Sequence, residues 1–464
     1  MKYLLALIFA ALAAFAFEPY GIWLFAVIGM AGWFTLLTQN GLKNRIYISY
    51  IFGACLLLIN QHWTGIYVGN IPWLILCLSQ ALIFIIPALF VQKNTKNTHL
   101  MFALSYVLTE LLLRTVPFTG FGWTRLSFTQ VESPFSDIYP VGGVALVAFF
   151  LALISSARSI KTVVIASLLP VICWLIPANV QTNAPTSIAL VQGGVVNLGL
   201  DFNSKPQEVF KRHLDQSILS IEPSEVDLVI WPENAVDVDV NSNLQVDDSI
   251  KNLSTILNTP ILIGGVTKSI EGPRNQSILY NSDKGQIYTK RYLTPFGEYL
   301  PLRSLAEKVS KYSNQVTDFQ AGEQNTIFNV NGIRFNTLIC YELINDLFVA
   351  EAKNDFLVIQ TNNATFGDTN QLDQQLNIAR VRALESARDI AYVSTTGTTS
   401  FISSQGEILS SLDKFKPATL KGKVYATEGL TFRQSFGHLV EPLAMIVLLV
   451  LVTIKVRRSS WSQY

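Results

Sequence analysis

Long apolar runs constrain this chain more than any other feature. Because a helix needs about 20 apolar residues to cross the hydrocarbon core of a bilayer, such runs predict membrane-spanning helices. Only 14% of the residues are charged, against roughly 25% in a soluble chain. The sequence therefore predicts an integral membrane α-helical bundle of about eight spans. The runs lie near residues 3–17, 21–38, 46–59, 71–91, 99–113, 138–157, 162–178 and 437–454.

Charged residues divide the chain into three parts. Residues 179–436 hold 22 Lys and Arg against 28 Asp and Glu, whereas all other residues hold 12 and 5. We expect a transmembrane domain of about seven helices over 1–178, a water-facing domain over 179–436, and a last helix with a short basic tail over 437–464. The chain has no block of positive charge of the kind that binds nucleic acid, so we expect no nucleic-acid partner.

The short loops between the apolar runs predict an orientation, because positive charges collect on cytoplasmic loops. A cytoplasmic N-terminus leaves two cations, Arg114 and Arg125, in the short outer loops. We therefore expect a multi-pass inner-membrane protein with both termini in the cytoplasm and 179–436 in the periplasm. A cleaved signal peptide ending at Ala14-Phe15-Ala16 is the alternative for the first run. The cations of the inner side are Lys2, Lys43, Arg45, Lys93, Lys96, Arg158, Lys161, Lys455, Arg457 and Arg458.

The water-facing domain alternates short β-rich runs with helical stretches, which predicts layered α/β packing. The predicted strands cover 187–192, 227–233, 260–266, 334–342, 355–363, 387–397 and 398–409. The predicted helices cover 204–221, 245–257, 343–353 and 371–388.

One cysteine, Cys340, falls in this domain, and the other three fall in apolar runs. A lone thiol on the oxidising side of a membrane is either a reactive group or a small buried hydrophobe. A nucleophilic cysteine needs a base to take its proton, and acyl transfer needs a cation for the developing oxyanion. Glu233 in WPEN, Lys290 in YTKRYLTPFGEYLP and Cys340 in LICYE could supply these roles. Taken singly, each could instead be a helix-start carboxylate, a solvated charge or a core residue.

In this order, the three motifs resemble the nitrilase, or carbon–nitrogen hydrolase, superfamily. With the apolar runs, LVQG (190–193), NNATFGDT (362–369) and FTGFGW (118–123), the chain resembles the membrane-bound apolipoprotein N-acyltransferase family. The resemblance implies that 179–436 is an extracytoplasmic αββα sandwich. It implies Cys340 as nucleophile, Glu233 as base and Lys290 as oxyanion stabiliser. Glu298 would orient Lys290 or the acyl intermediate, while Tyr341 and Glu342 would shape the pocket.

The resemblance also implies the substrates. A phospholipid, with phosphatidylethanolamine favoured, would donate an acyl chain to Cys340, and the free amine of a diacylglyceryl-cysteine lipoprotein would accept it. It implies no cofactor and favours a monomer among membrane lipids. The four histidines lack the spacing of metal ligands, so we expect no metal. Thr365, Thr395-Thr396 and Asp201-Phe202 depart from the family pattern and affect the expected substrate entrance.

Two other functions fit parts of the sequence. A membrane-tethered amidase would use the same three residues and release the acyl group to water, although tethering needs a single span. A transporter or lipid-binding protein with an inactive outer domain would place ionisable residues in its spans, where this chain has little beyond Glu110.

Overall fold

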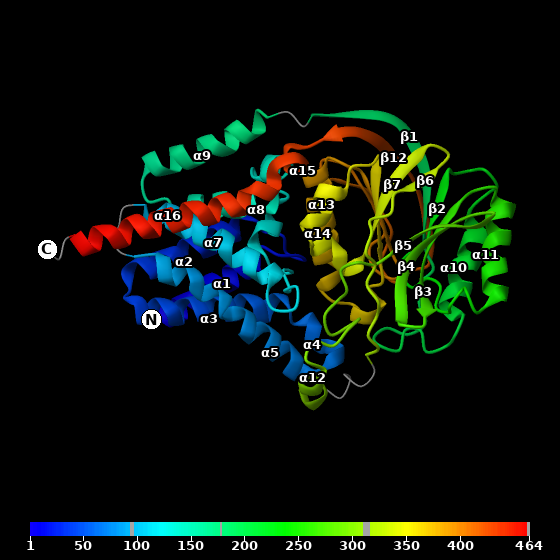
Figure 1. The fold of residues 1–464 in the computed structure, drawn as a ribbon, viewed down its shortest axis with the longest axis horizontal. Helices are drawn as coiled ribbons and strands as arrows, with labels where there is room; N and C mark the ends of the chain where they lie inside the picture. The colour runs from blue at the N-terminus through cyan, green and yellow to red at the C-terminus, as the bar shows by residue number, and fades with distance from the viewer. Residues whose placement is uncertain (93–96, 177–178, 310–315, 462–464) are drawn as a thin grey trace. The chain divides into compact units, whose positions relative to one another are not determined.

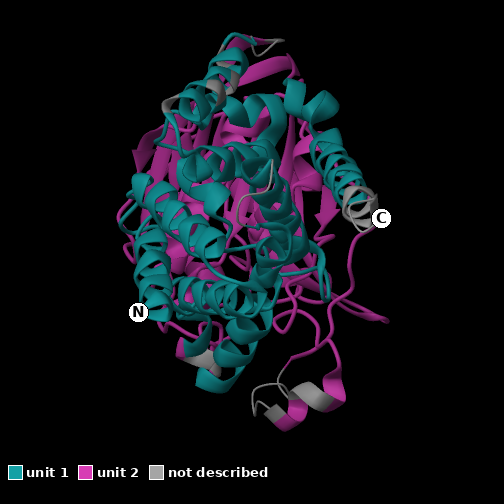
Figure 2. Ribbon diagram, turned by 90° about the vertical axis from the view of Figure 1, so that its left-hand side faces the viewer, with its two compact units in different colours: residues 1–65, 70–178, 431–464 teal, residues 66–69, 179–430 magenta. Residues whose placement is uncertain are grey.

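The chain forms two compact units in the computed structural model, which describes residues 1–92, 97–176, 179–309 and 316–461 (Figure 1). Unit 1 contains Met1–Gly65, Asn70–Ala178 and Thr431–Tyr464, and unit 2 contains Ile66–Gly69 and Asn179–Leu430 (Figure 2).

Unit 1 is helical. Its elements are α1 (Lys2–Ala14), α2 (Leu24–Gln39), α3 (Leu42–Asn60), α5 (Asn70–Ala81), η1 (Ile83–Ile85), α6 (Ile86–Phe90), α7 (Thr98–Thr115), η2 (Leu126–Gln130), η3 (Ser136–Ile138), α8 (Tyr139–Ser156), α9 (Ile160–Trp174), α15 (Phe432–Phe436), η7 (Gly437–Leu439) and α16 (Val440–Trp461). The short helix α4 (Trp63–Val68) lies at the boundary between the units.

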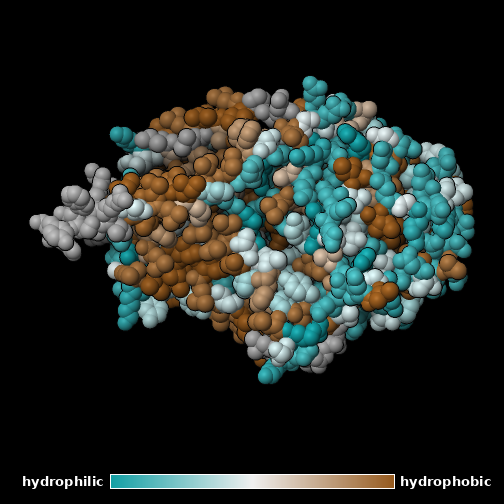
Figure 3. Space-filling view, in the orientation of Figure 1, coloured by the Kyte–Doolittle hydropathy of each residue, from teal (hydrophilic) through white to brown (hydrophobic). Residues whose placement is uncertain are grey.

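Four helical segments are long and apolar enough to cross a membrane: Leu42–Asn60, Asn70–Phe90, Ser136–Ser156 and Phe432–Lys455. Three shorter apolar helices cover Lys2–Ala14, Leu24–Gln39 and Lys161–Cys173. The chain is therefore a membrane protein with four candidate spans among the described residues, where the sequence predicted about eight. Large apolar side chains cover the outside of these helices, as Leu443, Ile446 and Leu449 do on α16 (Figure 3).

A buried polar cluster holds the loop that follows α7. Glu110, on α7, accepts hydrogen bonds from the backbone N–H and the hydroxyl of Ser127, and Tyr139 donates its hydroxyl to the Ser127 carbonyl. All three residues are buried. The ionisable residue that the sequence singled out within a span thus organises the neighbouring loop. At the end of the same helix, Arg114 forms an ion pair with Glu441 of α16.

Unit 2 contains two six-stranded sheets. The first has the order β12-β1-β2-β3-β4-β5, with β1, β2 and β3 parallel and its other pairs antiparallel. The second has the order β11-β10-β9-β8-β7-β6, with β7, β8 and β9 parallel and its other pairs antiparallel.

The strands of the first sheet are β1 (Asn179–Gln192), β2 (Leu228–Ile230), β3 (Ile261–Ser269), β4 (Gly272–Asn281), β5 (Asp283–Thr289) and β12 (Ala418–Leu430). Those of the second are β6 (Phe328–Val330), β7 (Ile333–Ile339), β8 (Phe356–Thr361), β9 (Ile390–Ser394), β10 (Ser400–Ile402) and β11 (Ile408–Ser411). The helices of unit 2 are α10 (Glu208–Ser220), α11 (Leu244–Leu257), α12 (Arg303–Val309), η5 (Cys340–Ile344), α13 (Leu347–Glu351), η6 (Ala364–Phe366) and α14 (Gln371–Ser386).

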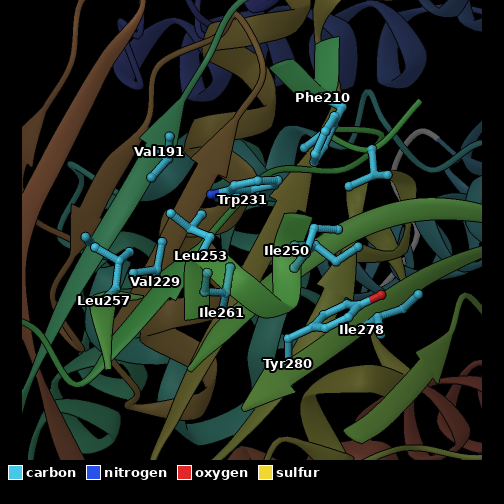
Figure 4. Packing of buried hydrophobic residues seen from close by; sticks show 14 of the residues in the cluster. Val191, Phe210, Val229, Trp231, Ile250, Leu253, Leu257, Ile261, Ile278 and Tyr280 are labelled. Carbon is cyan, nitrogen blue, oxygen red and sulfur yellow. The ribbon is translucent and has the colours of Figure 1, made fainter. Parts of the chain in front are cut away.

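The two sheets pack face to face with helices outside them, which makes the predicted layered α/β sandwich. Strand β1 contacts β9 and β4 contacts β7, while α10 and α11 cover the first sheet and α14 contacts the second. Apolar side chains of the first sheet fill the layer beneath α10 and α11 (Figure 4). Trp231 is fully buried there, and its indole N–H donates to Ser217 Oγ on α10 at 3.0 Å. This packing fixes the segment that leads from β2 to Glu233.

Four strands were missing from the sequence prediction: β4, β5, β6 and β12. Strand β12 pairs antiparallel with β1 along most of its length, and its burial alternates instead of being continuous. Its sequence carries Lys421 and Lys423 among small and polar residues, so it lacks the apolar run by which the buried strands were found.

Candidate active site

The residues singled out from the sequence lie at one end of the sandwich, because strands of the same direction end there. Glu233 follows β2, Cys340 directly follows β7, and Asn362 directly follows β8. Lys290 directly follows β5, which runs antiparallel to β4 and hence in the direction of β3. Side chains at the carboxyl ends of parallel strands are a common place for chemistry in α/β folds.

Lys290 is almost fully buried and lies between two carboxylates. Its Nζ lies 2.8 Å from Glu298 Oε2 and 3.6 Å from Glu233 Oε1. Burial alone would lower the pKa of Lys290, but the negative charges of Glu298 and Glu233 outweigh that effect and raise it above its usual value. The side chain is therefore a fixed ammonium in an enclosed site.

Asn275, on β4, joins the two carboxylates. Its Nδ2 donates to Glu233 Oε1 at 2.8 Å and to Glu298 Oε1 at 2.9 Å. The second oxygen of Glu233 accepts the backbone N–H of Asn362 at 2.8 Å. The sequence analysis missed both asparagines. Asn275 lies on a strand that was not predicted. Asn362 belongs to the NNATFGDT motif, but it contacts Glu233 through its backbone N–H, which no side-chain pattern indicates.

The two carboxyls that flank Lys290 differ in pKa. Burial raises the pKa of Glu233, and the ammonium of Lys290 only partly opposes this effect. For Glu298, burial would also raise the pKa, but the closer Lys290 ammonium outweighs it and the pKa is lowered. Glu298 is therefore held as the permanent partner of Lys290, whereas Glu233 is the carboxyl that takes up a proton more readily. Such a division of roles between paired carboxyls is typical of acid–base sites.

Cys340 begins the short helix η5 with a φ of +50°, in the left-handed region that residues other than glycine seldom occupy. A backbone of this kind costs on the order of 1–3 kcal/mol and is concentrated at functional sites. Desolvation of the thiol and then the negative charge of Glu233 raise the pKa of Cys340 to about 12, while the Lys290 ammonium opposes them. The thiol is therefore protonated at neutral pH and needs a base.

Glu342 forms hydrogen bonds that connect the segment after Lys290 with the start of η5 at Cys340. Its carboxylate accepts the Tyr288 hydroxyl at 2.7 Å and the backbone N–H groups of Arg291 at 2.8 Å and Tyr292 at 3.1 Å. Its other oxygen accepts the backbone N–H of Ile339 at 2.8 Å. The side chain is fully buried and faces backbone donors.

Tyr341, the other residue predicted to shape the pocket, is also buried, and desolvation raises the pKa of its hydroxyl. Another buried side chain, Gln375 of α14, donates its amide to Cys340 Sγ at 3.5 Å. The sequence analysis missed Gln375 because a glutamine inside a helix of ordinary polar composition carries no signal. Within the described ranges, no three His, Cys, Asp or Glu side chains are grouped as ligands for a metal ion.

Comparison with known families covers most of the chain. The model of the apolipoprotein N-acyltransferase N-terminal domain matches residues 9–157. The model of the carbon–nitrogen hydrolases matches residues 187–427, which is just over half of the chain. A solved carbon–nitrogen hydrolase superfamily protein from Xanthomonas campestris aligns with a TM-score of 0.39 and 17% identity over 52% of this chain and 91% of its own. The family assignment does not depend on that alignment.

Full-length relatives carry the same name as the first of these families. The apolipoprotein N-acyltransferase of Haemophilus influenzae is 29% identical, over 97% of this chain and 94% of its own. That of Vibrio vulnificus is also 29% identical, over 92% of each chain, and that of Mycolicibacterium smegmatis is 27% identical, over 93% of this chain and 81% of its own. By these matches, this chain belongs to the apolipoprotein N-acyltransferases of the carbon–nitrogen hydrolase family.

Proposed function

We propose that Cys340 carries the acyl chain as a thioester between a phospholipid donor and the N-terminal amine of a diacylglyceryl-cysteine lipoprotein. The main observation behind this proposal is that Lys290 is paired with one of the two neighbouring carboxylates and not with the other. Lys290 is paired with Glu298 at 2.8 Å, which leaves Glu233 as a carboxylate with a raised pKa beside a protonated thiol. A base, a cation and a nucleophile are the groups that acyl transfer requires.

In the first half-reaction, the Cys340 thiol gives its proton to Glu233, and the sulfur attacks the ester carbonyl carbon of the phospholipid. The carbonyl oxygen gains negative charge, which Lys290 stabilises. The ester C–O bond then breaks, Glu233 returns the proton to the leaving alkoxide, and a lysophospholipid departs. The result is a thioester on Cys340.

In the second half-reaction, the lipoprotein amine attacks the thioester carbon, and Glu233 takes a proton from the attacking nitrogen. The C–S bond breaks, the amide is released, and the sulfur recovers a proton from Glu233. Because the same base serves both steps and ends each in its starting state, the cycle needs no cofactor.

Lys290 suits the oxyanion role because its position is fixed before the substrate arrives. Two carboxylates hold the ammonium, and Asn275 holds both carboxylates, so little reorganisation is needed during the reaction. Removal of one such fixed donor typically costs about 10²–10³-fold in rate. Glu298 acts as a positioning residue in this scheme, since it holds Lys290.

We also propose that 1–178 form a transmembrane domain in the inner membrane and that 437–464 form a last span with a short basic cytoplasmic tail, giving about eight spans with both termini in the cytoplasm. Residues 179–436 then face the periplasm. The ten-to-two bias of cations between the short loops supports this orientation. Both substrates are lipid-anchored, so confining the enzyme to the same surface raises the rate of encounter.

A transfer assay tests the proposal. Purified protein in detergent receives phosphatidylethanolamine with a labelled acyl chain and a diacylglyceryl-cysteine peptide, and the labelled peptide is measured. Wild type and a Cys173→Ala control should form the labelled peptide, and Cys340→Ala should not. Glu233→Gln and Lys290→Ala should each lose about 10²–10⁴-fold, with Lys268→Ala as the exposed-lysine control. Hydrolysis of soluble amides without any transfer would favour the tethered amidase instead.

A further inference from the structure

The amide of Gln375 is directed at the sulfur of Cys340. We propose that Gln375 is a further catalytic residue, whose Nε2–H hydrogen bond stabilises the Cys340 thiolate when it attacks the donor and again when it leaves the thioester. This role rests on the proposed function, in which Cys340 is the nucleophile. The supporting contact is the 3.5 Å approach of Gln375 Nε2 to Cys340 Sγ, from a side chain with no exposed surface.

A chain of hydrogen bonds fixes which end of the Gln375 amide faces the sulfur. The backbone N–H of Gly397 can only donate, and it donates to Ser394 Oγ at 2.7 Å. The Ser394 hydroxyl donates in turn to Asn363 Oδ1 at 2.5 Å. Asn363 Nδ2 therefore points the other way and donates to Gln375 Oε1 at 2.6 Å. The NH₂ group of Gln375 is left for Cys340.

Three more donors face the same oxygen. Thr361 Oγ1 lies 3.1 Å, Tyr392 Oη 3.3 Å and Gln371 Nε2 3.1 Å from Gln375 Oε1. A flipped amide would set its own N–H groups against the Asn363 and Gln371 amides and lose these bonds. The orientation of Gln375 is thus determined by its surroundings and does not depend on the cysteine.

Gly397 leaves the space in which this chain of hydrogen bonds forms. A Cβ atom at this position would lie 2.6 Å from Asn363 Oδ1 and 2.8 Å from Ser394 Oγ, closer than real Cβ contacts. The loop after β9 is therefore shaped around the two side chains that orient Gln375.

Two neutral donors, Thr361 at the end of β8 and Gln375, favour the thiolate by hydrogen bonds to the sulfur. Glu233, after β2, opposes the thiolate by its charge, and Tyr392, on β9, adds no positive charge. Lys290, after β5, favours the thiolate, but its ammonium is already shared between two carboxylates. A neutral amide stabilises negative charge on sulfur without taking a proton and without attracting Glu233 away from its role as base.

Alkylation of Cys340 measures this effect without any lipid substrate. Full-length protein in detergent reacts with iodoacetamide, and in parallel with the smaller methyl methanethiosulfonate, between pH 7 and 9.5, and peptide mass spectrometry follows Cys340. The variants are Gln375→Met, which keeps the size and removes the donor, and Gln375→Glu, which keeps the acceptor and adds charge. Gln245→Met, at an exposed position of α11, is the control.

The rate should rise about tenfold per pH unit in every protein, because only the thiolate reacts. Gln375→Met should react about 10- to 100-fold more slowly at each pH with both reagents, since a hydrogen bond to a charged group is lost. Gln375→Glu should be slower still, and Gln245→Met should match wild type.

Equal rates for wild type and Gln375→Met would overturn the proposal, and so would a loss seen with the larger reagent alone, since that reports access. If Gln375→Met does not fold, equal rates for wild type and Gln375→Glu would overturn the proposal. Absence of an acyl adduct on wild-type Cys340 would instead count against the proposed function, whatever the alkylation rates.

Discussion

The Lys290 ammonium lies 2.8 Å from the carboxylate of Glu298, and both side chains are buried. The corresponding distance to Glu233 is 3.6 Å. The lysine is therefore paired mainly with Glu298. Glu233 receives its hydrogen bonds from Asn275 and from the backbone of Asn362, so the carboxyl proposed as base is not neutralised by a close ion pair.

Replacement of Glu298 by glutamine should impair both Lys290 and Glu233. Without the carboxylate, Lys290 would turn toward Glu233, which lowers the basicity of Glu233 and displaces the cation. We expect the transfer rate to fall about 10²-fold or more, as for loss of a positioned base. Steady-state transfer to a diacylglyceryl-cysteine peptide measures it. Glu271→Gln, at an exposed position before β4, is the control and should transfer at the wild-type rate. A wild-type transfer rate in Glu298→Gln would exclude the positioning role of Glu298.

Replacement of Glu342 by glutamine should lower stability as well as activity. In the wild type, backbone N–H groups donate to the two oxygens of the Glu342 carboxylate. In the variant, an NH₂ group replaces one of these oxygens, so the buried N–H groups that faced it have no acceptor. A loss of about 3 kcal/mol is expected for hydrogen bonds to a charged group. For a unit of this size, the melting temperature should fall by about 6–12 °C.

Tyr288→Phe is the matched control for Glu342→Gln, because it removes one donor to Glu342 and keeps the backbone bonds. Its melting temperature should fall less. If Glu342→Gln melts at the wild-type temperature, the hydrogen bonds that Glu342 accepts do not contribute to the stability of the fold.

The pH dependence of transfer should report the protonation of Glu233. Burial raises the pKa of this carboxyl above its ordinary value of 4.5, and the base must be ionised to act. The rate should therefore be complete above the raised pKa and fall as the pH drops through it, with an acid midpoint above 4.5. Asn275→Leu removes a hydrogen bond that favours the ionised form, so its midpoint should lie higher still. A midpoint below 4.5 in wild type would contradict the assignment of the base.

A methyl group at Gly264 should disturb Glu233 from the neighbouring strand. A Cβ atom there would lie 2.4 Å from the carbonyl oxygen of Pro232 and 2.7 Å from Glu233 Cα, so the backbone at the base must shift. Because misplacement of a reacting group by about 1 Å can cost about 10²-fold, Gly264→Ala should lose transfer activity strongly. Gly285→Ala, where the nearest atom would be 3.3 Å away, should remain near wild type. Comparable activity of the two variants would contradict this geometry.

The sequence predicted strands that read as continuous apolar runs, and it missed β4, whose buried segment includes Asn275, Gln276 and Ser277. β3 and β8 were found because a strand covered on both faces reads as a continuous apolar run, as in ILIGGV and FLVIQT. β12 was missed because one of its faces is exposed and carries lysines. α1 and α2 are shorter than a full bilayer span: α1 ends at Ala14, three residues before its apolar run does, and α2 begins at Leu24, three residues after its run does.

At the site, the sequence predicted the residues to which we assign the chemistry, and it missed Asn275 and Gln375, which donate hydrogen bonds to them. Glu233, Lys290 and Cys340 have motifs around them, and each directly follows or closely follows a strand. Asn275 donates to Glu233 and Glu298, which are 42 and 23 positions away, and Gln375 donates to Cys340, which is 35 positions away. Those pairings exist only in the folded chain. The role of Glu342 in shaping the pocket stays a prediction; its carboxylate accepts the backbone N–H groups of Arg291 and Ile339.

The intact mass of the purified protein tests the central claim most directly. The protein is incubated with phosphatidylethanolamine and then with a diacylglyceryl-cysteine peptide, with Cys340→Ala in parallel. We expect a mass gain of one acyl chain in wild type, which hydroxylamine removes, which the peptide discharges, and which Cys340→Ala never acquires. Transfer to the peptide by the Cys340→Ala protein, or an adduct that maps to another residue, would contradict a thioester on Cys340.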